Sequence, residues 1–212
     1  MGIIGVVAAL TLPNLNSSTG DKEKVAKVKK VYSNLNDAMG RAIAVYGPYN
    51  EWTLKDSSTV AQYIRVGERL SEFMKVSKNC STSSGCFKND VKLNCGSTSS
   101  DLSSAAGEMR YKFILADGTA ISLTPDKIYI DIDGQSKGAN TVSKDIFGFG
   151  INSETGEITP MGSDLLAKGV NFLTCSCFND GDAECTAWVI QNDNMDYLKC
   201  PSKLTDNNTS CK

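Results

Sequence analysis

The sequence predicts an α+β domain in which a long N-terminal helix packs on an antiparallel sheet of three to five strands. Apolar residues recur at every third or fourth position between residues 21 and 46, as on one face of an amphipathic helix. Residues 109–160 change to an alternation of apolar and polar positions interrupted by turn residues, which is typical of antiparallel strands. A helical part followed by a stranded part favours an α+β fold over alternating βαβ units.

The first segment, residues 1–20, opens with the apolar run IIGVVAALTL. The run has about ten residues, whereas a helix that spans a bilayer needs about 20. No basic residue precedes it, as one would in a secretory signal, and Val6 stands where N-myristoylation requires Ser or Thr. We interpret the run as the second half of a membrane helix whose first half precedes this sequence. Its residues are Ile3, Ile4, Val6, Val7, Leu10, Leu12 and Pro13.

The second segment, residues 21–47, is the clearest helix of the chain. Thr19 or Asp21 is the expected cap, Gly47-Pro48 ends the helix, and its length is about 39 Å. Five lysines cluster in its first turns, and we interpret them as a solvated face, with contact to anionic lipid headgroups as the alternative. The apolar stripe consists of Val25, Val28, Tyr32, Leu35, Met39, Ala42 and Tyr46.

The remaining segments are an insertion (48–108), the sheet (109–160) and a cysteine-rich tail (161–212). The insertion is expected to contain a second helix at about 59–75 and, from residue 76, a loop rich in Ser, Thr and Gly. In the tail, a short ordered element is expected between residues 185 and 200. The expected strands lie at 111–115, 120–123, 127–132, 146–151 and 157–160.

The eight cysteines predict a disulfide framework and hence an oxidising compartment, either extracellular or periplasmic. Zinc is the rival, but paired C-x-x-C knuckles are absent and Cys175-Ser176-Cys177 is too tight for the usual ligand spacing. Three cysteines lie in the insertion and five in the tail, so at least one bridge must join these segments if all eight pair internally. They are Cys80, Cys86, Cys95, Cys175, Cys177, Cys185, Cys200 and Cys211.

The composition argues against the commonest routes of catalysis. The 22 basic and 24 acidic residues nearly cancel, so no overall charge favours nucleic acid. The absence of histidine excludes Ser-His-Asp and Cys-His catalysis and every metal site that needs imidazole. We therefore expect no enzyme. A hydrolase that uses Asp131 and Asp133 is the weakest alternative, because carboxylates two residues apart on a strand fit a turn or a metal better than an acid–base pair.

Three stretches of the chain resemble type IV pilin-like proteins, including the pseudopilins of type II secretion systems. IIGVVAALTLPNL is similar to the second half of that family's N-terminal membrane helix, with its proline at Pro13, and the amphipathic helix follows directly. IYIDIDGQSKGANTVSKDIFGF is similar to a strand–loop–strand stretch of pseudopilins in which Asp-x-Asn-Gly, Gly-Pro-Asn and Asp-x-Phe recur in that order. Within it, Asp133 stands in place of asparagine and Ala139 in place of proline.

The resemblance implies a structural subunit of a type IV pilus-like filament or a secretion pseudopilus, assembled through its N-terminal helix. Other pilin or pseudopilin subunits are then its partners. It implies a location in the inner membrane of a bacterium before assembly, and in a periplasmic or extracellular filament afterwards. The main alternative is a secreted or surface-anchored binding module or adhesin, whose disulfide-stabilised tail recognises a partner.

The loop at residues 131–145 offers several oxygen donors, and some pseudopilins bind calcium in this region. Asp131, Asp133 and Asp145 would supply carboxylates, with backbone carbonyls between them. Val142 stands where an EF-hand has its bidentate glutamate, so an EF-hand is excluded. The alternative is a loop whose aspartates cap turns and stay solvated. No other cofactor is expected.

Overall fold

The computed structural model describes residues 3–52, 59–87, 91–92, 98–99, 110–134, 137, 140–163, 185–205 and 207–212. For residues 3–18, 91–92 and 98–99 only the backbone is described. Cys95, Cys175 and Cys177 lie outside the described residues, as do much of the expected Ser- and Thr-rich loop and the first part of the tail.

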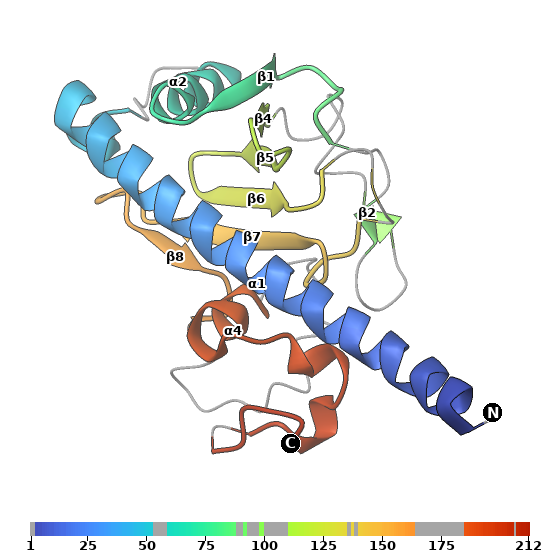
Figure 1. Cartoon of the computed structure of the whole chain (residues 1–212). Coiled ribbons are helices and arrows are strands. Elements are labelled where there is room, and N and C mark those ends of the chain that lie inside the picture. The colour runs from blue at the N-terminus through green and yellow to red at the C-terminus, as the bar shows by residue number, and fades with distance from the viewer. Residues whose placement is uncertain are drawn as a thin grey trace.

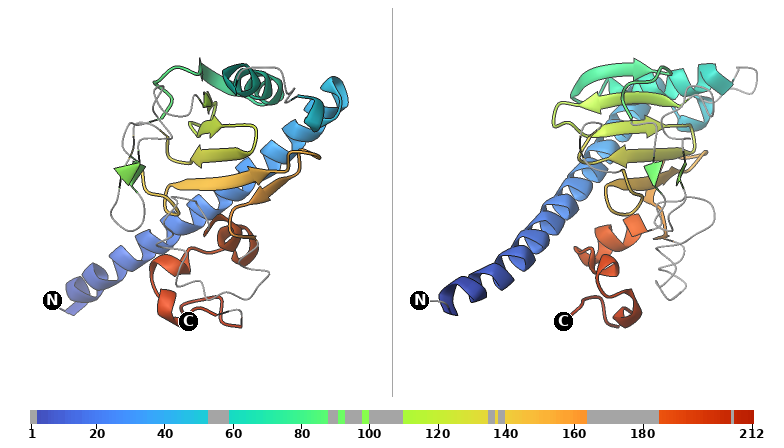
Figure 2. Two further views of the ribbon diagram at one scale, coloured as in Figure 1. Left: turned by 180° about the vertical axis from the view of Figure 1, so that it is seen from behind. Right: turned by 90° about the vertical axis from the view of Figure 1, so that its right-hand side faces the viewer.

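Helix α1 (Ile3–Tyr46) is continuous over 44 residues. The expected helix start, with its cap at Thr19 or Asp21, is wrong, because the helix is already formed before these residues. A glycine inside a helix costs about 1 kcal/mol and polar residues cost less, so Gly20 and its neighbours do not stop a helix that has hydrogen-bonded turns on both sides. Its C-terminal part crosses one face of the sheet, while its N-terminal part extends away from the rest of the chain (Figures 1 and 2).

The main sheet has six strands, each antiparallel to its neighbours, in the order β1-β4-β5-β6-β7-β8. The expected three to five strands were too few, because β1 falls where the loop was expected. This edge strand is largely exposed and its pairing with β4 has two register shifts, so its sequence carries no regular alternation. The strands are β1 (Val76–Ser81), β4 (Tyr111–Leu115), β5 (Ala120–Leu123), β6 (Lys127–Asp131), β7 (Ile146–Ile151) and β8 (Ile158–Pro160).

The main core lies between α1 and one face of the sheet. The predicted stripe of α1 is confirmed, with Tyr32 and Tyr46 partly buried and the other members buried. The Tyr32 ring stacks on that of Phe149 in β7, with ring centroids 5.3 Å apart and an angle of 3° between the planes. The sheet contributes inward-facing residues from its central strands, including Phe113, Ile121, Leu123, Ile128, Ile130, Phe147 and Phe149.

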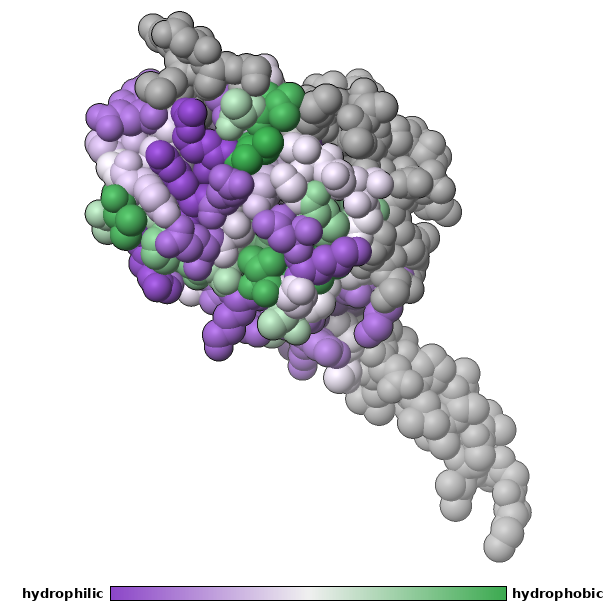
Figure 3. Space-filling model, turned by 90° about the horizontal axis from the view of Figure 1, so that it is seen from above, coloured by the Kyte–Doolittle hydropathy of each residue, from purple (hydrophilic) through white to green (hydrophobic). Residues whose placement is uncertain are grey.

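Helix α2 (Thr59–Ser71) covers the β4 end of the sheet. At Gly67 the helix backbone lies directly on the ring of Tyr111, where an added Cβ would come within 2.1 Å of the ring carbon Cγ. Seen from above, the face over α2 and β1 is mostly hydrophilic, with small and separate hydrophobic patches (Figure 3). A short 3-10 helix, η1 (Tyr49–Glu51), follows α1, and β2 (Val91–Lys92) pairs with β3 (Thr98–Ser99) in a separate ribbon.

The tail contributes helix α4 (Cys185–Asn192) and the short 3-10 helices η3 (Asp196–Leu198) and η4 (Pro201–Lys203). The ordered element expected between residues 185 and 200 is thus confirmed. Helix α4 contacts α1, β7 and β8, where the Gly148 backbone N–H donates to the Thr186 hydroxyl (2.9 Å). The tail lies beside the part of α1 that leaves the sheet (Figure 1).

Candidate functional site

Residues 21–30 of α1, here called the collar, carry the lysine cluster where the helix leaves the domain. The expectation of a solvated face is only partly right. Lys24 pairs with the Asp145 carboxylate just before β7, Lys29 with Asp193 after α4 (2.5 Å), and Lys30 with Asp117 in the β4–β5 turn (3.1 Å). In a further ion pair the carboxylate lies on the collar: Asp21 pairs with Lys199 of the tail (2.6 Å). Three separate segments are therefore held to one stretch of helix.

These ion pairs differ in how deeply they are buried. The Asp145 side chain is 7% exposed and the Lys24 side chain 27%, whereas the members of the Lys29–Asp193 pair are 43% and 66% exposed. Exposed pairs contribute at most about 1 kcal/mol, but a buried carboxylate that loses its partner is strongly destabilising. Lys24–Asp145 is thus the pair on which the position of the collar chiefly depends.

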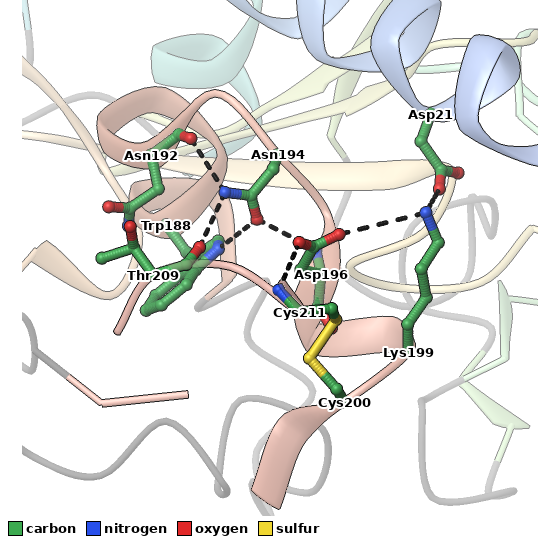
Figure 4. Close-up of polar contacts among 9 residues, drawn as sticks. All are labelled: Asp21, Trp188, Asn192, Asn194, Asp196, Lys199, Cys200, Thr209 and Cys211. Atoms are coloured by element: carbon green, nitrogen blue, oxygen red, sulfur yellow. Dashed lines mark hydrogen bonds and ion pairs between the residues drawn. A yellow bond between two sulfur atoms is a disulfide. The ribbon is translucent and has the colours of Figure 1, made fainter. Parts of the chain in front are cut away.

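Asn194 organises the tail beside the collar (Figure 4). Its side-chain oxygen accepts hydrogen bonds from Trp188 Nε1 and from the Asp196 backbone N–H, both 3.0 Å. Its amide nitrogen donates to the carbonyls of Asn192 and Thr209, both 2.9 Å. Both ends of its side-chain amide are thus used within the tail.

Asp196 connects this network to the chain end and, through Lys199, to the collar (Figure 4). Its Oδ2 accepts a hydrogen bond from the Cys211 backbone N–H (2.8 Å), next to the Cys200–Cys211 disulfide. Tyr197 is 4% exposed, and its hydroxyl donates to the Ser143 carbonyl (2.7 Å). Burial, with the nearby Asp21 and Asp145 carboxylates, raises the Tyr197 pKa well above its ordinary value, so this donor stays protonated.

The three aspartates of the expected calcium loop are used in different ways. Asp131 and Asp133 lie side chain to side chain, whereas the Asp145 carboxylate is bound to Lys24. Asp131 is fully buried, and its Oδ1 accepts a hydrogen bond from the Gly134 backbone N–H (3.0 Å). Burial, followed by the adjacent Asp133, raises the pKa of Asp131 to about 7.

Two oxygens of this aspartate pair, Asp131 Oδ2 and Asp133 Oδ1, are buried; the two carboxyls share a hydrogen bond when Asp131 is protonated, and these oxygens lack a donor only when both groups are ionised. Such oxygens suit a cation. However, the described part of the chain contains no group of three or more His, Cys, Asp or Glu residues placed to hold a metal ion. Of the three expected calcium ligands, Asp131 and Asp133 lie together, whereas Asp145 forms an ion pair with Lys24 of the collar.

The disulfide framework is confirmed at the cysteines that the structure describes. Cys80 pairs with Cys86 in the insertion and Cys200 with Cys211 in the tail. Cys185 is also disulfide-bonded. Both of the described bridges are local, so neither is the predicted link between the insertion and the tail.

Two pockets along α1 were not expected from the sequence. One, of about 370 Å³, lies between α1, the link from α2 to β1 and the β4–β5 turn, and has Phe73, Met74 and Leu115 among its lining residues. The other, here called the collar pocket, has a volume of about 560 Å³ and lies between the collar, the β4–β5 turn and the turn after β6. Pockets of this kind join residues far apart in the chain, so no local sequence pattern indicates them.

The apolar run Ile3–Leu12 and Pro13 belong to the N-terminal part of α1, for which the backbone alone is described. Within the described residues, no helix combines the length and the apolar character needed to cross a membrane. Comparison with known proteins gives no family: no protein-family model matches the sequence, and neither a curated protein nor a solved structure is significantly similar to it.

Proposed function

We propose that the protein is a structural subunit of a pilus-like or pseudopilus-like filament that assembles through α1. The observation that carries the proposal is the geometry of one continuous helix. From Val25 to Ala42 it is part of the domain core, and before the collar it extends away from the domain with an apolar sequence (Figure 2). The ion pairs of the collar support this role, because they fix the direction in which the helix leaves the domain.

An apolar helix outside the domain needs a cover, because exposed apolar area favours association. A membrane provides that cover before assembly, and neighbouring copies provide it in a filament. If the helix of one copy packs against a different surface of the next copy, the contact is heterologous. Repeating such a contact builds an open helical filament unless the rotation between copies closes them into a ring. Disulfides in the domain are compatible with an extracellular or periplasmic location.

A single substitution in the apolar run tests this proposal. The full chain, kept as single copies in detergent, is expected to form extended assemblies when the detergent is removed, as seen by electron microscopy and sedimentation velocity. Val7→Lys is expected to prevent assembly, because a charge in an apolar contact is costly. Lys22→Met, in the exposed part of the collar, is the matched control. Assembly of Val7→Lys at the wild-type level would refute the proposal.

A binding module or adhesin is the second candidate, and the tail favours it. The Cys200–Cys211 bridge and the Asn194 network give this segment a defined surface, on which Leu198 is 40% exposed. Under this alternative, Val7→Lys leaves the function intact, while substitutions at Leu198 and Lys203 abolish partner binding.

Calcium binding at Asp131 and Asp133 is retained as a proposal, supported by two buried carboxyl oxygens that have no donor when both groups are ionised. With Asp145 bound to Lys24, the site has one carboxylate fewer than expected. Calorimetric titration with CaCl₂ after treatment with EDTA tests it, and heat that persists in Asp131→Asn would contradict it.

A further inference from the structure

The pocket of about 370 Å³ beside Phe73, here called the Phe73 pocket, has a preformed apolar floor. Its volume lies within the range of ligand pockets. Leu115 in the floor is buried, and Phe73 and Met74 are partly buried. The Ala116 backbone N–H donates to the Lys75 carbonyl (2.8 Å), which joins the β4–β5 turn to the link from α2 to β1. The floor is therefore in place before any ligand binds.

The opposite wall of the Phe73 pocket is one face of α1. The lining residues on this helix recur at spacings of three and four, which places them on the same side of it; they are Lys30, Asn34, Asp37 and Arg41. Lys30 forms an ion pair with Asp117, which also lines the pocket (3.1 Å), so these two charges cancel. The electrostatic character of the pocket is then decided by its other charged side chains.

Two cations of the lining have no strong partner. Arg41 and Asp37 approach to 3.8 Å, with side chains 58% and 69% exposed. This separation is longer than a hydrogen bond, and exposed pairs of this kind are weak. The Lys75 ammonium has no hydrogen-bond or ion-pair partner among the described residues. With three basic side chains against two acidic ones in its lining, the pocket carries a surplus positive charge that is available to an anion.

Arg41 connects this charge to the apolar floor. Its guanidinium lies over the Phe73 ring, with the carbon Cζ 4.9 Å from the ring centroid. A guanidinium that stacks on a ring keeps N–H donors at its edges, and their planar arrangement matches the two oxygens of a carboxylate. The pocket therefore offers a carboxylate donor next to an aromatic surface.

We propose that the Phe73 pocket binds a small aryl carboxylate. The carboxylate of the ligand lies against Arg41 and Lys75, and its aromatic ring lies on the floor formed by Phe73, Met74 and Leu115. An aromatic ring suits this floor, because a methionine thioether and a phenylalanine ring both make favourable contacts with it. An amine of the same shape is repelled by the surplus positive charge.

Amide chemical shifts of the ¹⁵N-labelled full chain, kept as single copies in a non-ionic detergent, test the pocket. The probe 3-phenylpropionate is expected to give saturable shifts at Phe73, Met74, Lys75 and Ala116. The amide 3-phenylpropionamide has the same shape without the charge and should bind at least about tenfold more weakly, the size of one charge-assisted hydrogen bond. The amine 3-phenylpropylamine, which carries the opposite charge, should give no saturable shifts.

Substitutions of the charged side chains, all of them exposed, identify the contacts. Arg41→Met should weaken binding of 3-phenylpropionate about tenfold, and Lys75→Met about threefold. Asp37→Asn should strengthen binding, because it removes the carboxylate that competes for Arg41. Lys22→Met, on the same helix and outside the pocket, is the matched control and should leave binding unchanged.

Equal binding of 3-phenylpropionate and its amide would overturn the proposal, as would the absence of saturable shifts. Affinity that is unchanged in both Arg41→Met and Lys75→Met would also overturn it. Shifts confined to Gly20 and Gly134 would place the probe in the collar pocket and count against the proposal in the same way. None of these measurements requires filament assembly, so failure here leaves the proposed function standing.

Discussion

Gly67 lies where α2 comes closest to the sheet. The Tyr111 ring below it is 1% exposed, and its hydroxyl accepts a hydrogen bond from Asn79, so the ring cannot move aside easily. Gly67→Ala is therefore expected to lower the free energy of unfolding by about 1–3 kcal/mol, measured by urea denaturation. Gly40→Ala is the control: Gly40 is exposed in α1 with open space around it, and alanine there should stabilise by about 0.5–1 kcal/mol. Equal effects at the two sites would contradict this view of the packing.

The two kinds of ion pair at the collar make a second comparison. Lys24→Met leaves the buried Asp145 carboxylate without its cation, and we expect a loss of about 1–3 kcal/mol in the free energy of unfolding. Lys29→Met removes an exposed pair and should cost less than about 0.5 kcal/mol. Urea denaturation at low and high salt measures both. A similar loss for the two variants would show that burial of Asp145 does not matter.

The Asp131 carboxyl makes stability depend on pH. Its folded-state pKa of about 7 lies above the ordinary value of 3.8, so its contribution is fully present below pH 3.8. That contribution falls as pH rises toward 7, because deprotonation is then favoured in the unfolded chain. Asp131→Asn should flatten the pH dependence of the unfolding midpoint between about pH 4 and 7, measured in EDTA. A wild-type profile parallel to that of the variant would contradict the raised pKa.

At the scale of elements, α1 and the central strands were predictable because their buried residues recur at the regular spacing of a helix or a strand. Val28, Leu35 and Ala42 recur on one helix face because that face is the core. Strand β1 lacks such a signal, since it is an exposed edge with two register shifts. The sequence analysis placed the start of the helix near Gly20 because glycine and polar residues have low helix propensity. In a long helix, cooperative propagation from both sides outweighs such a local preference. The ion pairs of the collar and its pocket join distant segments, and no local pattern reveals them.

The tail is ordered by the Asn194 hydrogen bonds together with buried apolar side chains such as Trp188 and Met195. Asn194→Ala leaves Trp188 Nε1 and the Asn192 and Thr209 carbonyls without their partner, so residues 193–211 should open more readily. Hydrogen exchange is expected to quicken by about tenfold in this segment and to stay unchanged in β4–β7. Asn207→Ala, at an exposed tail position, serves as the control. Unchanged exchange at Asn194→Ala would show that the disulfide and the buried apolar side chains order the tail without this network.

At the scale of the whole molecule, α1 and the tail are organised around the same stretch of helix. The collar pairs with the β4–β5 turn, the segment before β7 and the tail, so forces on the projecting helix reach the sheet and the tail together. A filament subunit needs this coupling, because neighbours that pack on the helix must hold the domain in a fixed orientation. The tail is thus part of the support of the helix as well as a surface.

The cysteines predict one further constraint on the whole chain. Cys80–Cys86 and Cys200–Cys211 leave Cys95 in the insertion and Cys175, Cys177 and Cys185 in the tail segment. Since Cys185 is disulfide-bonded, its partner is one of the other three. If all eight cysteines pair, Cys95 has no remaining partner in the insertion and must join the tail. This bridge would close a loop of at least about 80 residues, for which the chain-entropy model gives on the order of 4 kcal/mol.

Peptide mapping of the unreduced protein measures this connectivity directly. We expect one cross-linked species that contains Cys95 together with Cys175, Cys177 or Cys185, and that separates on reduction. Cys95→Ser should then leave one free thiol in the tail segment and lower the unfolding midpoint more than Cys80→Ser paired with Cys86→Ser, because the latter bridge closes a loop with a separation of only 6. Recovery of Cys95 as a free thiol in the native protein would show that the insertion and the tail are held together by non-covalent contacts alone.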